Sequence, residues 1–340
     1  MISFRNDYSE GAHPLVMQAL CDTNLEATPG YGRDVYCEAA AQAVRTRFAC
    51  PQADVHFLVG GTIANLTAIS AFLRPWEAVV TIDTAHICVH ESGSIEACGH
   101  RICSVPGENG KLTAAQLREV VETHKGGDDG HMVVPKLVYL SDATELGTVY
   151  TKSELTELHS VCQELGLYLY LDGARMGAAL VSRENDLYPE DFAKLCDAFY
   201  IGGTKNGLLF GEALVIVNDA FKPHFRNCIK QHGAMLAKGR LLGLQFSAFF
   251  KDDLWLDMAR HAARAAEKIA AAMVQKGYAF YAAPSTNQLF PILPAHKLAV
   301  LQQNFDFELT ARLPDDRWAV RFVTSWATTD EAVDALIAAL

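Results

Sequence analysis

Between residues 53 and 217, short apolar runs alternate with amphipathic stretches, and this alternation limits the folds open to the chain more than any other feature. Each run is rich in Val, Ile, Leu and Tyr and is bounded by Gly, Pro, Asp or Asn. The runs are Val55–Val59, Ala78–Ile82, Arg101–Val105, Leu137–Ser141, Tyr168–Leu171, Ala198–Gly202 and Ala213–Val217. Continuous apolar runs of this length are typical of strands covered on both faces. The pattern predicts an α/β fold with helices on both sides of a mostly parallel, seven-stranded sheet.

Signals for helix starts and ends lie between these runs. Thr113 and Gln116 have the spacing of a capping box, and so do Thr151 and Glu154. Gly166 is placed to end the second of these helices. The stretches between the predicted strands are therefore expected to be helical.

The pattern changes after Asn218. A long helix is predicted over Leu254–Lys276, and shorter elements follow it. These are strands at Ala279–Tyr281, Leu289–Leu293, Phe305–Leu309 and Trp318–Val323, and helices at Ala295–Gln302 and Thr328–Leu340, the last opened by a capping box at Thr328. The chain has 340 residues, more than one compact core usually holds. We expect an N-terminal segment and large domain over residues 1–245 and a small α+β domain over residues 246–340.

Charge and cysteine content argue against several classes of protein. The net charge is −11 and no block of Lys and Arg occurs, so nucleic acid and anionic membranes are not expected partners. No segment is long and apolar enough to span a bilayer, and the N-terminus lacks the apolar core of a secretory signal. The nine cysteines form no C-x-x-C pair. An odd number of scattered cysteines in a chain of this size indicates reduced thiols in a cytoplasmic protein.

Two predicted strands run into stretches that carry reactive groups. Ile201–Gly207 contains Lys205 among small residues, and Leu171–Arg175 contains Asp172. A lysine alone in a Gly-rich turn is more often a surface residue. Paired with a carboxylate, it suits an enzyme that holds pyridoxal 5′-phosphate (PLP) as a Schiff base, with Asp172 against the pyridinium nitrogen.

A glycine pair follows the first predicted strand and precedes a predicted helix. Gly60 and Gly61 let the backbone approach an anion, Thr62 adds a hydroxyl, and the helix N-terminus supplies free N–H groups. Neither a dinucleotide fingerprint nor a Walker loop is present. The stretch is a candidate phosphate cradle, although strand-to-helix turns of this kind are common.

His86 also follows a predicted strand. It is a candidate to lie on a planar cofactor ring or to act as an acid or base. A metal site with His90 and Glu91 is disfavoured, because the H-E-x-x-H order is missing and no third ligand is apparent. His90 and Glu91 otherwise suit a solvated or satisfied helix start.

Two arginines are candidates to bind a carboxylate. Arg175 can do so in a bidentate fork, and a salt bridge to Asp172 is the alternative. Arg321 lies in an apolar strand and needs an anionic partner, either a substrate carboxylate or an ordinary glutamate.

In this order the motifs resemble those of the PLP-dependent threonine aldolase/β-eliminating lyase family, within the aspartate-aminotransferase-like superfamily. The resemblance covers nearly the whole chain. It is carried by Phe4-Arg5-Asn6-Asp7, Gly30-Tyr31-Gly32, Gly61-Thr62 with Asn65, His86 with Glu91 and Gly93, Leu171–Arg175, Thr204-Lys205 and Arg321–Thr324.

The resemblance implies how PLP is held. Lys205 forms the Schiff base, Asp172 pairs with the ring nitrogen, and His86 stacks on the ring near the substrate hydroxyl. No metal is expected. The implied cofactor-binding set is Gly61, Thr62, His86, Asp172, Arg175, Thr204, Lys205, Lys238 and Arg240.

The resemblance also implies how the substrate and a neighbouring subunit take part. Arg175 and Arg321 clamp the substrate carboxylate, with Asn6 and Tyr31 as further substrate contacts. Tyr31 is expected to reach the site of a neighbouring subunit, and a cation from 238–240 to reach the phosphate across the same interface. Relatives are commonly dimers of dimers, so a homo-oligomer is expected.

The resemblance implies retro-aldol cleavage of an L-3-hydroxy-α-amino acid to glycine and an aldehyde. Asn6 stands where relatives often have Ser, and Thr144 where many threonine aldolases have a second histidine. A low-specificity enzyme acting on threonine, allo-threonine or phenylserine is compatible with the change at Thr144. The alternatives are β-elimination to pyruvate and ammonia, served by the same residues, and a non-catalytic protein of the same fold.

Overall fold

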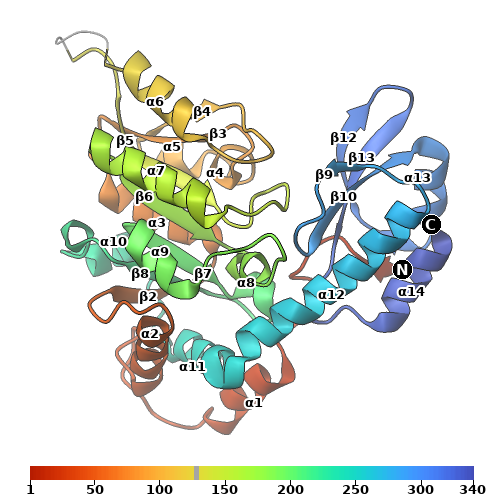
Figure 1. Cartoon of the computed structure of the whole chain (residues 1–340). Helices are drawn as coiled ribbons and strands as arrows, with labels where there is room; N and C mark the ends of the chain where they lie inside the picture. The colour runs from red at the N-terminus through yellow and green to blue at the C-terminus, as the bar shows by residue number, and fades with distance from the viewer. Residues whose placement is uncertain (126–129) are drawn as a thin grey trace.

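The computed structural model describes residues 1–125 and 130–340 and shows a large and a small lobe (Figure 1). The large lobe is built around a seven-stranded sheet in the order β2-β8-β7-β6-β5-β3-β4. Its strands are β2 (Asp54–Leu58), β3 (Glu77–Ile82), β4 (Arg101–Val105), β5 (Val134–Ser141), β6 (Tyr168–Gly173), β7 (Ala198–Gly202) and β8 (Glu212–Ile216). All seven predicted strands are confirmed, with small shifts at their ends.

Only β8 runs against its neighbours in this sheet. It pairs antiparallel with β2 and β7, whereas the remaining pairs are parallel. The beginning of β8, at Glu212, therefore lies at the same edge of the sheet as the carboxyl ends of the other strands. This edge positions the candidate site.

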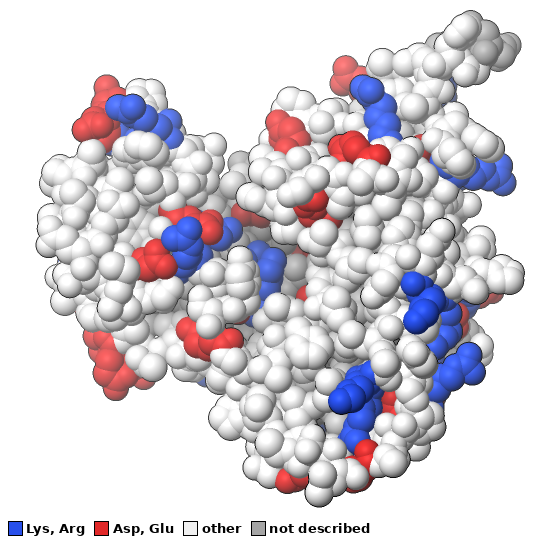
Figure 2. Space-filling view, turned by 180° about the vertical axis from the view of Figure 1, so that it is seen from behind, with Lys and Arg blue, Asp and Glu red and all other residues white. Residues whose placement is uncertain are grey.

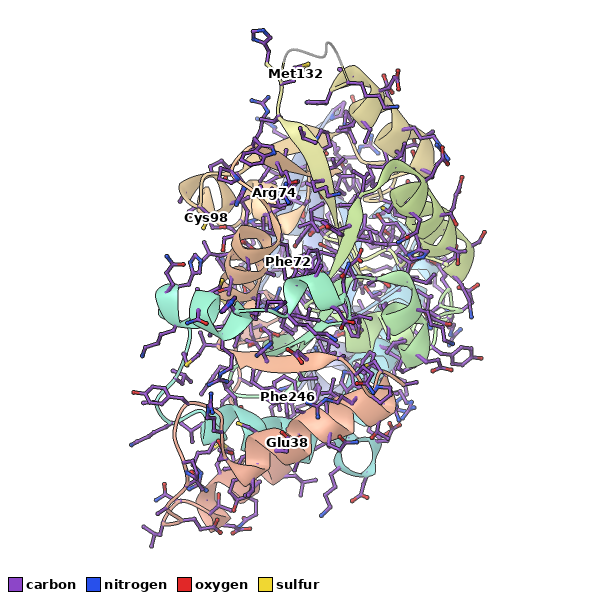
Figure 3. All side chains as sticks on the ribbon, turned by 90° about the vertical axis from the view of Figure 1, so that its left-hand side faces the viewer. Glu38, Phe72, Arg74, Cys98, Met132 and Phe246 are labelled. Atoms are coloured by element: carbon purple, nitrogen blue, oxygen red, sulfur yellow. The ribbon has the colours of Figure 1, made fainter. Side chains whose placement is uncertain are left out.

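Helices cover both faces of the sheet. In the side view, α3 (Gly61–Phe72) lies on one side and α7 (Lys152–Leu165) and α9 (Pro189–Leu195) lie on the other (Figure 3). Every residue of β3, β7 and β8 is buried, which explains why most residues of these strands are apolar. The remaining large-lobe helices are α1 (Pro14–Asp22), α2 (Val35–Arg47), α4 (His86–Val89), α5 (Ser94–Ala97), α6 (Ala114–Thr123), α8 (Met176–Leu180), α10 (Phe225–Gln231) and α11 (Arg240–Phe250).

The predicted helix boundaries between the strands are confirmed. The capping boxes of Thr113 with Gln116 and of Thr151 with Glu154 both form. Gly166 ends α7 with φ of 67°, a left-handed conformation that glycine adopts without a β-carbon clash. Local side-chain chemistry thus sets where these two helices begin and end.

The small lobe contains a four-stranded antiparallel sheet in the order β12-β13-β10-β9. Its elements are β9 (Phe280–Ala282), β10 (Gln288–Pro294), α13 (Ala295–Leu301), β12 (Glu308–Leu313), β13 (Arg317–Val323) and α14 (Asp330–Ala339). A separate two-stranded sheet joins β1 (Ile2–Ser3) to β11 (Phe305–Asp306) in parallel. Phe4, next to β1, is fully buried in the core of the small lobe.

One long helix, α12 (Leu254–Gln275), links the two lobes (Figure 1). Trp255 and Met258 near its start belong to the core of the large lobe, and Ile269 and Met273 belong to the core of the small lobe. The division of the chain into residues 1–245 and 246–340 stays a prediction.

Two predictions for the small lobe are wrong in detail. Phe305–Leu309 is not one strand: Phe305 and Asp306 pair with β1, whereas Glu308 begins a strand that pairs with β13. The cap of α14 is Thr329, whose side chain accepts the N–H of Ala332. The hydroxyl oxygen of Thr328 instead accepts the N–H of Ser325, in the turn before the helix.

All nine cysteines are free thiols, and five are buried: Cys37, Cys50, Cys103, Cys162 and Cys196. In the part of the chain that the structure describes, no helix is long and apolar enough to cross a membrane.

Candidate active site

A cavity of about 350 Å³ lies at the edge of the large sheet where β2, β6 and β7 end and β8 begins. Seen from behind, Lys, Arg, Asp and Glu side chains lie in the hollow between the two lobes (Figure 2). Predicted site residues from four segments line the cavity together: Gly61, Thr62, His86, Asp172, Arg175, Thr204 and Lys205. This arrangement is the one expected for residues that follow the strands of a parallel sheet.

Asp172 of β6 is buried and hydrogen-bonded through both oxygens. Oδ2 accepts from the Tyr139 hydroxyl at 2.5 Å and from Nδ2 of Asn65 at 3.0 Å, and Oδ1 accepts from the Ala174 N–H at 3.0 Å. Burial by itself raises the pKa of Asp172, but nearby His86 and the hydrogen bonds outweigh it, and the pKa is lowered. The carboxylate is therefore ionised at neutral pH and can pair with a protonated ring nitrogen.

Lys205 lies in the short 3₁₀ turn Thr204–Asn206 that follows β7. Burial and the positive charge of Arg175 lower the pKa of Lys205, and nearby carboxylates offset part of this shift. Its Nζ atom lies 5.9 Å from the centroid of the Tyr8 ring. A lysine with a lowered pKa has a larger fraction of neutral amine and is a better nucleophile.

The N-terminus of α3 faces the same cavity. Gly60 is the N-cap residue, and no side chain of the described residues caps the helix, so its first N–H groups are available to an anion. A β-carbon at Gly61 would lie 2.9 Å from the hydroxyl of Tyr200, so glycine keeps this approach open. The uncapped first turn, with the Thr62 hydroxyl beside it, fits a phosphate group.

His86 is held by a buried carboxylate. Its Nδ1 atom lies 2.8 Å from Oε1 of Glu91, which also accepts from Nδ2 of Asn65 at 2.8 Å. Oε2 of Glu91 accepts from the Ser94 hydroxyl at 2.9 Å. Of the two alternatives for Glu91, a solvated helix start is therefore excluded, whereas a buried and hydrogen-bonded one agrees with the structure. Among the described residues, no group of three His, Cys, Asp or Glu side chains could hold a metal ion.

Arg175 pairs with Asp7, not with Asp172. Its Nε lies 2.7 Å from Oδ2 of Asp7 and its Nη2 lies 3.0 Å from Oδ1, so the pair is bidentate and buried. Nδ2 of Asn287 donates a further hydrogen bond to Asp7 at 3.0 Å. The alternative of a salt bridge between Arg175 and Asp172 is therefore excluded, and Arg175 is oriented from behind by the N-terminal segment.

Arg321 has an ordinary glutamate as its partner in this structure. Its Nη2 atom lies 2.6 Å from Oε2 of Glu308, the residue directly opposite it on β12. Burial and the charge of Arg175 lower the pKa of Arg321. The Nε of Arg321 is buried and has no partner among the described residues.

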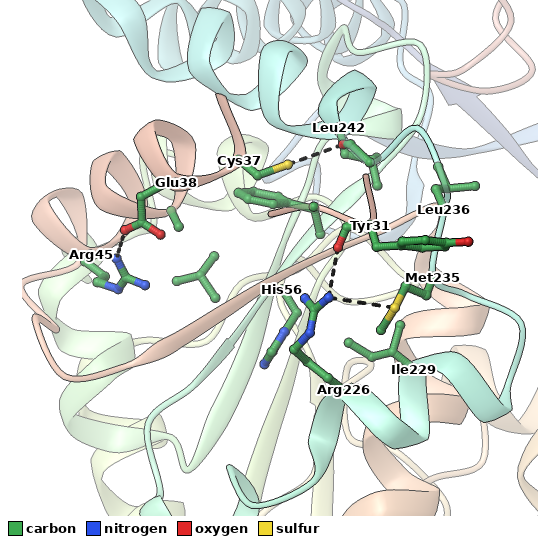
Figure 4. Close-up of a pocket in the computed structure, with 15 residues that line it drawn as sticks. Tyr31, Cys37, Glu38, Arg45, His56, Arg226, Ile229, Met235, Leu236 and Leu242 are labelled. Carbon is green, nitrogen blue, oxygen red and sulfur yellow. Dashed lines mark hydrogen bonds and ion pairs between the residues drawn. The ribbon is translucent and has the colours of Figure 1, made fainter. Parts of the chain in front are cut away.

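Arg321 is not among the residues that line the cavity, and four more predicted site residues also lie outside it. Asn6 accepts from the Tyr8 N–H at 3.0 Å and from the Ser9 hydroxyl at 2.9 Å. Tyr31 lines a second cavity on the large lobe, where Nη2 of Arg226 donates to its carbonyl oxygen (Figure 4).

Lys238 and Arg240 line a third cavity, of about 250 Å³, near α1. Lys238 is exposed there, and the Arg240 guanidinium donates to the carbonyl oxygens of Thr23 and Glu26. Within a single chain these cations do not reach the cavity that holds Lys205.

The structure adds residues to the site that the sequence did not single out. Tyr8, Glu145 and Glu212 line the cavity, and Asp7 lies directly behind Arg175. Oε1 of Glu145 accepts from the backbone N–H of His86 at 2.9 Å. Asp7 is the last residue of the motif Phe4-Arg5-Asn6-Asp7 quoted for the family resemblance, and Tyr8 follows it directly. Glu145 and Glu212 are single carboxylates whose importance depends on tertiary position.

Comparison with known proteins identifies the family. The sequence matches the family described as Beta-eliminating lyase over residues 4–295. The chain belongs to the β-eliminating lyase family. It is 30% identical to the low specificity L-threonine aldolase of Pseudomonas aeruginosa over 344 residues, which cover 98% of this chain and 95% of that protein.

Solved structures agree with this membership of the β-eliminating lyase family. The Leishmania major threonine aldolase superposes with a TM-score of 0.97 at 44% identity and covers 99% of this chain and 98% of that one. Aspartate aminotransferase from Thermus thermophilus, at 12% identity and a TM-score of 0.71, shares the fold over 100% of this chain and 90% of its own. The predicted resemblance, the aspartate-aminotransferase-like fold and the assignment as a carbon–carbon lyase are confirmed.

Proposed function

We propose that this protein is a PLP-dependent aldolase that cleaves L-3-hydroxy-α-amino acids, of the threonine, allo-threonine and phenylserine type, to glycine and an aldehyde. The observation that carries the proposal is the convergence of Lys205, ionised Asp172 and the uncapped start of α3 on one cavity. PLP, when bound, supplies an electron sink for the carbanion that forms when a bond to Cα breaks.

The residues that would hold PLP follow from the site geometry. Lys205 supplies the amine, Asp172 accepts a hydrogen bond from the ring nitrogen, and Gly61 and Thr62 bind the phosphate at the helix N-terminus. The hydrogen bonds from Tyr139 and Asn65 keep the Asp172 carboxylate in place. Thr204, which is also predicted to bind the cofactor, is hydrogen-bonded to Glu212.

The substrate carboxylate is proposed to bind between the two arginines. Asp7 fixes the plane of the Arg175 guanidinium, which leaves the remaining N–H groups of Arg175 to bind a carboxylate. The buried, unpartnered Nε of Arg321 is a second donor for the same group. Binding the carboxylate in one place would fix the orientation of the bonds to Cα in the site.

His86 is proposed to accept the proton of the β-hydroxyl, directly or through water. Thr144, which also lines the cavity, is not a second base: its hydroxyl lies 2.7 Å from that of Thr148. His90 also lines the cavity, but Glu91 holds His86, so we propose that one fixed histidine contacts the β-hydroxyl and that the substituent at Cβ is bound loosely. This supports low specificity for the side chain at Cβ.

We also propose a homo-oligomer, a dimer of dimers, in a cytoplasmic protein. Tyr31 is 46% exposed and lies outside the Lys205 cavity, as do Lys238 and Arg240. Tyr31 and Lys238 are exposed and can contact a neighbouring subunit, whereas Arg240 would have to exchange its hydrogen bonds to Thr23 and Glu26 to do so. The nine free thiols are consistent with a reducing compartment.

The proposal is tested with purified protein, PLP and, separately, L-threonine, L-allo-threonine, L-phenylserine and L-serine. Glycine and an aldehyde are the expected products. Pyruvate and ammonia would replace the aldolase by the β-elimination alternative and leave the roles of Lys205 and Asp172 intact. Neither product pair, with no absorbance band from bound PLP, would contradict both activities.

A further inference from the structure

Glu212 is a buried carboxyl group that the roles above do not use. It begins β8, and its exposed fraction is 4%. In the sheet it pairs with Gly202 of β7 on one side and with Leu58 of β2 on the other. The chain continues from Gly202 to Lys205, and from Leu58 to the start of α3. Glu212 therefore lies between the two segments proposed to hold the cofactor.

The Glu212 carboxyl binds the turn that carries Lys205. Its Oε2 accepts the Gly203 N–H at 2.9 Å, and its Oε1 lies 2.8 Å from Oγ1 of Thr204. The same Thr204 oxygen accepts the Gly211 N–H at 3.0 Å. Thr204 and Glu212 both line the cavity, next to the N-terminus of α3.

The number of protons in this cluster is limited. A threonine hydroxyl has one proton to donate and two lone pairs, and Gly211 uses one lone pair. The contact between Thr204 and Glu212 holds one proton, which comes either from Thr204 or from a protonated Glu212. In the first case Thr204 has no proton left for a ligand. In the second, its own proton is free to point into the cavity.

We propose that Glu212 sets the direction of the Thr204 hydroxyl proton and so decides whether Thr204 donates a hydrogen bond to the phosphate of the cofactor. The protonated carboxyl donates to Thr204, which then donates to the phosphate. The ionised carboxylate accepts the hydrogen bond of the Thr204 hydroxyl, which then cannot donate to the phosphate, and it places a negative charge beside that phosphate. Glu212 is a positioning residue, since it acts through Thr204. The inference rests on the proposed function because its ligand is PLP.

The surroundings of Glu212 favour the protonated form at neutral pH. Burial raises the pKa of Glu212 to about 8, although hydrogen bonds from Thr204 and Gly203 and the charge of Lys205 act in the opposite direction. Asp172 is the nearby carboxylate and raises the pKa further.

The phenols of Tyr170 and Tyr200 also face this carboxyl. Their burial raises the pKa of each well above its ordinary value, so both stay neutral. The Thr204 donor is thus available near pH 7 and is lost as the pH rises through about 8.

The test compares the binding of PLP with that of pyridoxal, which lacks the phosphate, to the full-length protein freed of cofactor. Absorbance titrations at pH values on both sides of 8 give a dissociation constant for each ligand. The ratio of the two dissociation constants isolates the contribution of the phosphate to binding, because titration of Lys205 affects the binding of both ligands. In the wild type, the preference for PLP is expected to fall about tenfold between about pH 7 and pH 9, the worth of one hydrogen bond to a charged group.

Two positions supply the variants. Glu212→Gln keeps the shape of the side chain, and its amide N–H donates to Thr204 at every pH. From pH 7 to pH 9, the preference of this variant for PLP over pyridoxal is expected to stay near the value that the wild type has at pH 7. Thr204→Val lacks the donor, and its preference is expected to be about tenfold lower already at pH 7. Thr204→Ser keeps the hydroxyl and is expected to follow the wild type. Thermal unfolding of each variant checks that it is folded.

A Glu212→Gln variant whose preference falls with pH as steeply as that of the wild type would overturn the inference. So would a Thr204→Val variant that matches Thr204→Ser, a comparison that does not depend on Glu212→Gln folding. A wild type that binds both ligands with a constant ratio would overturn this inference alone. A wild type that binds neither ligand would overturn the proposed function as well.

Discussion

Nδ1 of His86 lies 2.8 Å from Oε1 of Glu91, whose side chain is completely buried. A carboxylate oxygen accepts the hydrogen bond here, so Nδ1 of His86 carries a proton, and Nε2 is the nitrogen left to exchange a proton with a substrate. Asn65 donates both to this carboxylate and to Asp172 and so joins the two groups. The tautomer of His86 and the orientation of Asp172 are therefore set by one buried network.

Replacing Glu91 by glutamine tests this network. An amide does not hold one tautomer of His86, and the rate of aldehyde formation from L-phenylserine is expected to fall about 100-fold, within the range for general base catalysis. Glu96→Gln, an exposed residue of the neighbouring helix, is the matched control and should keep wild-type activity. Equal activities of the two variants would contradict the role of Glu91.

Substituting a residue proposed to support the electron sink should reduce activity more than substituting a residue proposed to bind the phosphate. Lys205→Ala is expected to abolish glycine formation, and Asp172→Ala to lose far more activity than Thr62→Ala, because Asp172 keeps the ring nitrogen protonated. Turnover at saturating PLP separates this effect from weaker binding. Full activity of Lys205→Ala, or equal losses for the other two, would contradict the proposed mechanism.

The pair of Asp7 and Arg175 should be important for stability as well as binding. Asp7→Asn leaves a buried guanidinium without its counter-charge, and urea titration is expected to show a loss of about 3 kcal/mol in the free energy of unfolding. The Michaelis constant for the amino acid should rise as Arg175 loses its orientation. Asp306→Asn removes a half-exposed pair with Arg5 and is the control, with an expected loss below about 1 kcal/mol.

The same pair predicts a pH dependence. Burial raises the pKa of Asp7, but the charges of Arg175 and Lys205 and the hydrogen bonds to Asp7 outweigh it, so the folded-state pKa lies below 3.8. The contribution of ionised Asp7 to the free energy of unfolding is thus complete above the pKa that Asp7 has in the unfolded chain. It disappears as the pH falls through the pKa that Asp7 has in the folded protein. The difference in unfolding free energy between wild type and Asp7→Asn should be constant from pH 7 to about pH 5 and shrink below about pH 4. A difference that persists unchanged into acid would exclude a charge effect.

Substitutions of Gly61 and Tyr200 should have strongly non-additive effects on PLP affinity. In Gly61→Ala the new β-carbon would lie 2.9 Å from the Tyr200 hydroxyl, so the phosphate loop must shift and PLP affinity should fall at least about tenfold. Tyr200→Phe removes the clashing oxygen. Gly61→Ala/Tyr200→Phe is therefore expected to bind PLP more tightly than Gly61→Ala, as measured by absorbance titration. If the double variant binds more weakly, the clash does not explain the glycine.

Strands that are buried on both faces could be predicted, because burial makes their sequences largely apolar. The seven strands of the large sheet are covered on both faces, so their apolar runs were visible without any structure. Site residues at strand ends, such as Asp172 and Lys205, could be located for the same reason. The match to the family then added their chemistry.

Elements defined by a distant partner could not be predicted. Phe305–Leu309 has one uniform pattern, yet Asp306 pairs with Ser3 and Glu308 with Arg321. Asp7 and Glu212 are single acidic residues without a periodic pattern, and their importance comes from Arg175 and Thr204, which only the fold brings near. The choice of Thr329 over Thr328 as a helix cap depends on a turn that no propensity encodes.

The pairing of β1 with β11 has a consequence for the order of events during synthesis. Asp7 and Tyr8, which contact Arg175 and Lys205, are anchored through Phe4 in a core made mostly of residues after 265. A growing chain can complete the seven-stranded sheet long before residue 305 has left the ribosome. Until then the N-terminal segment has no partner strand, and the substrate site lacks one wall. The protein should thus become catalytically competent only when the last fifth of the chain is released.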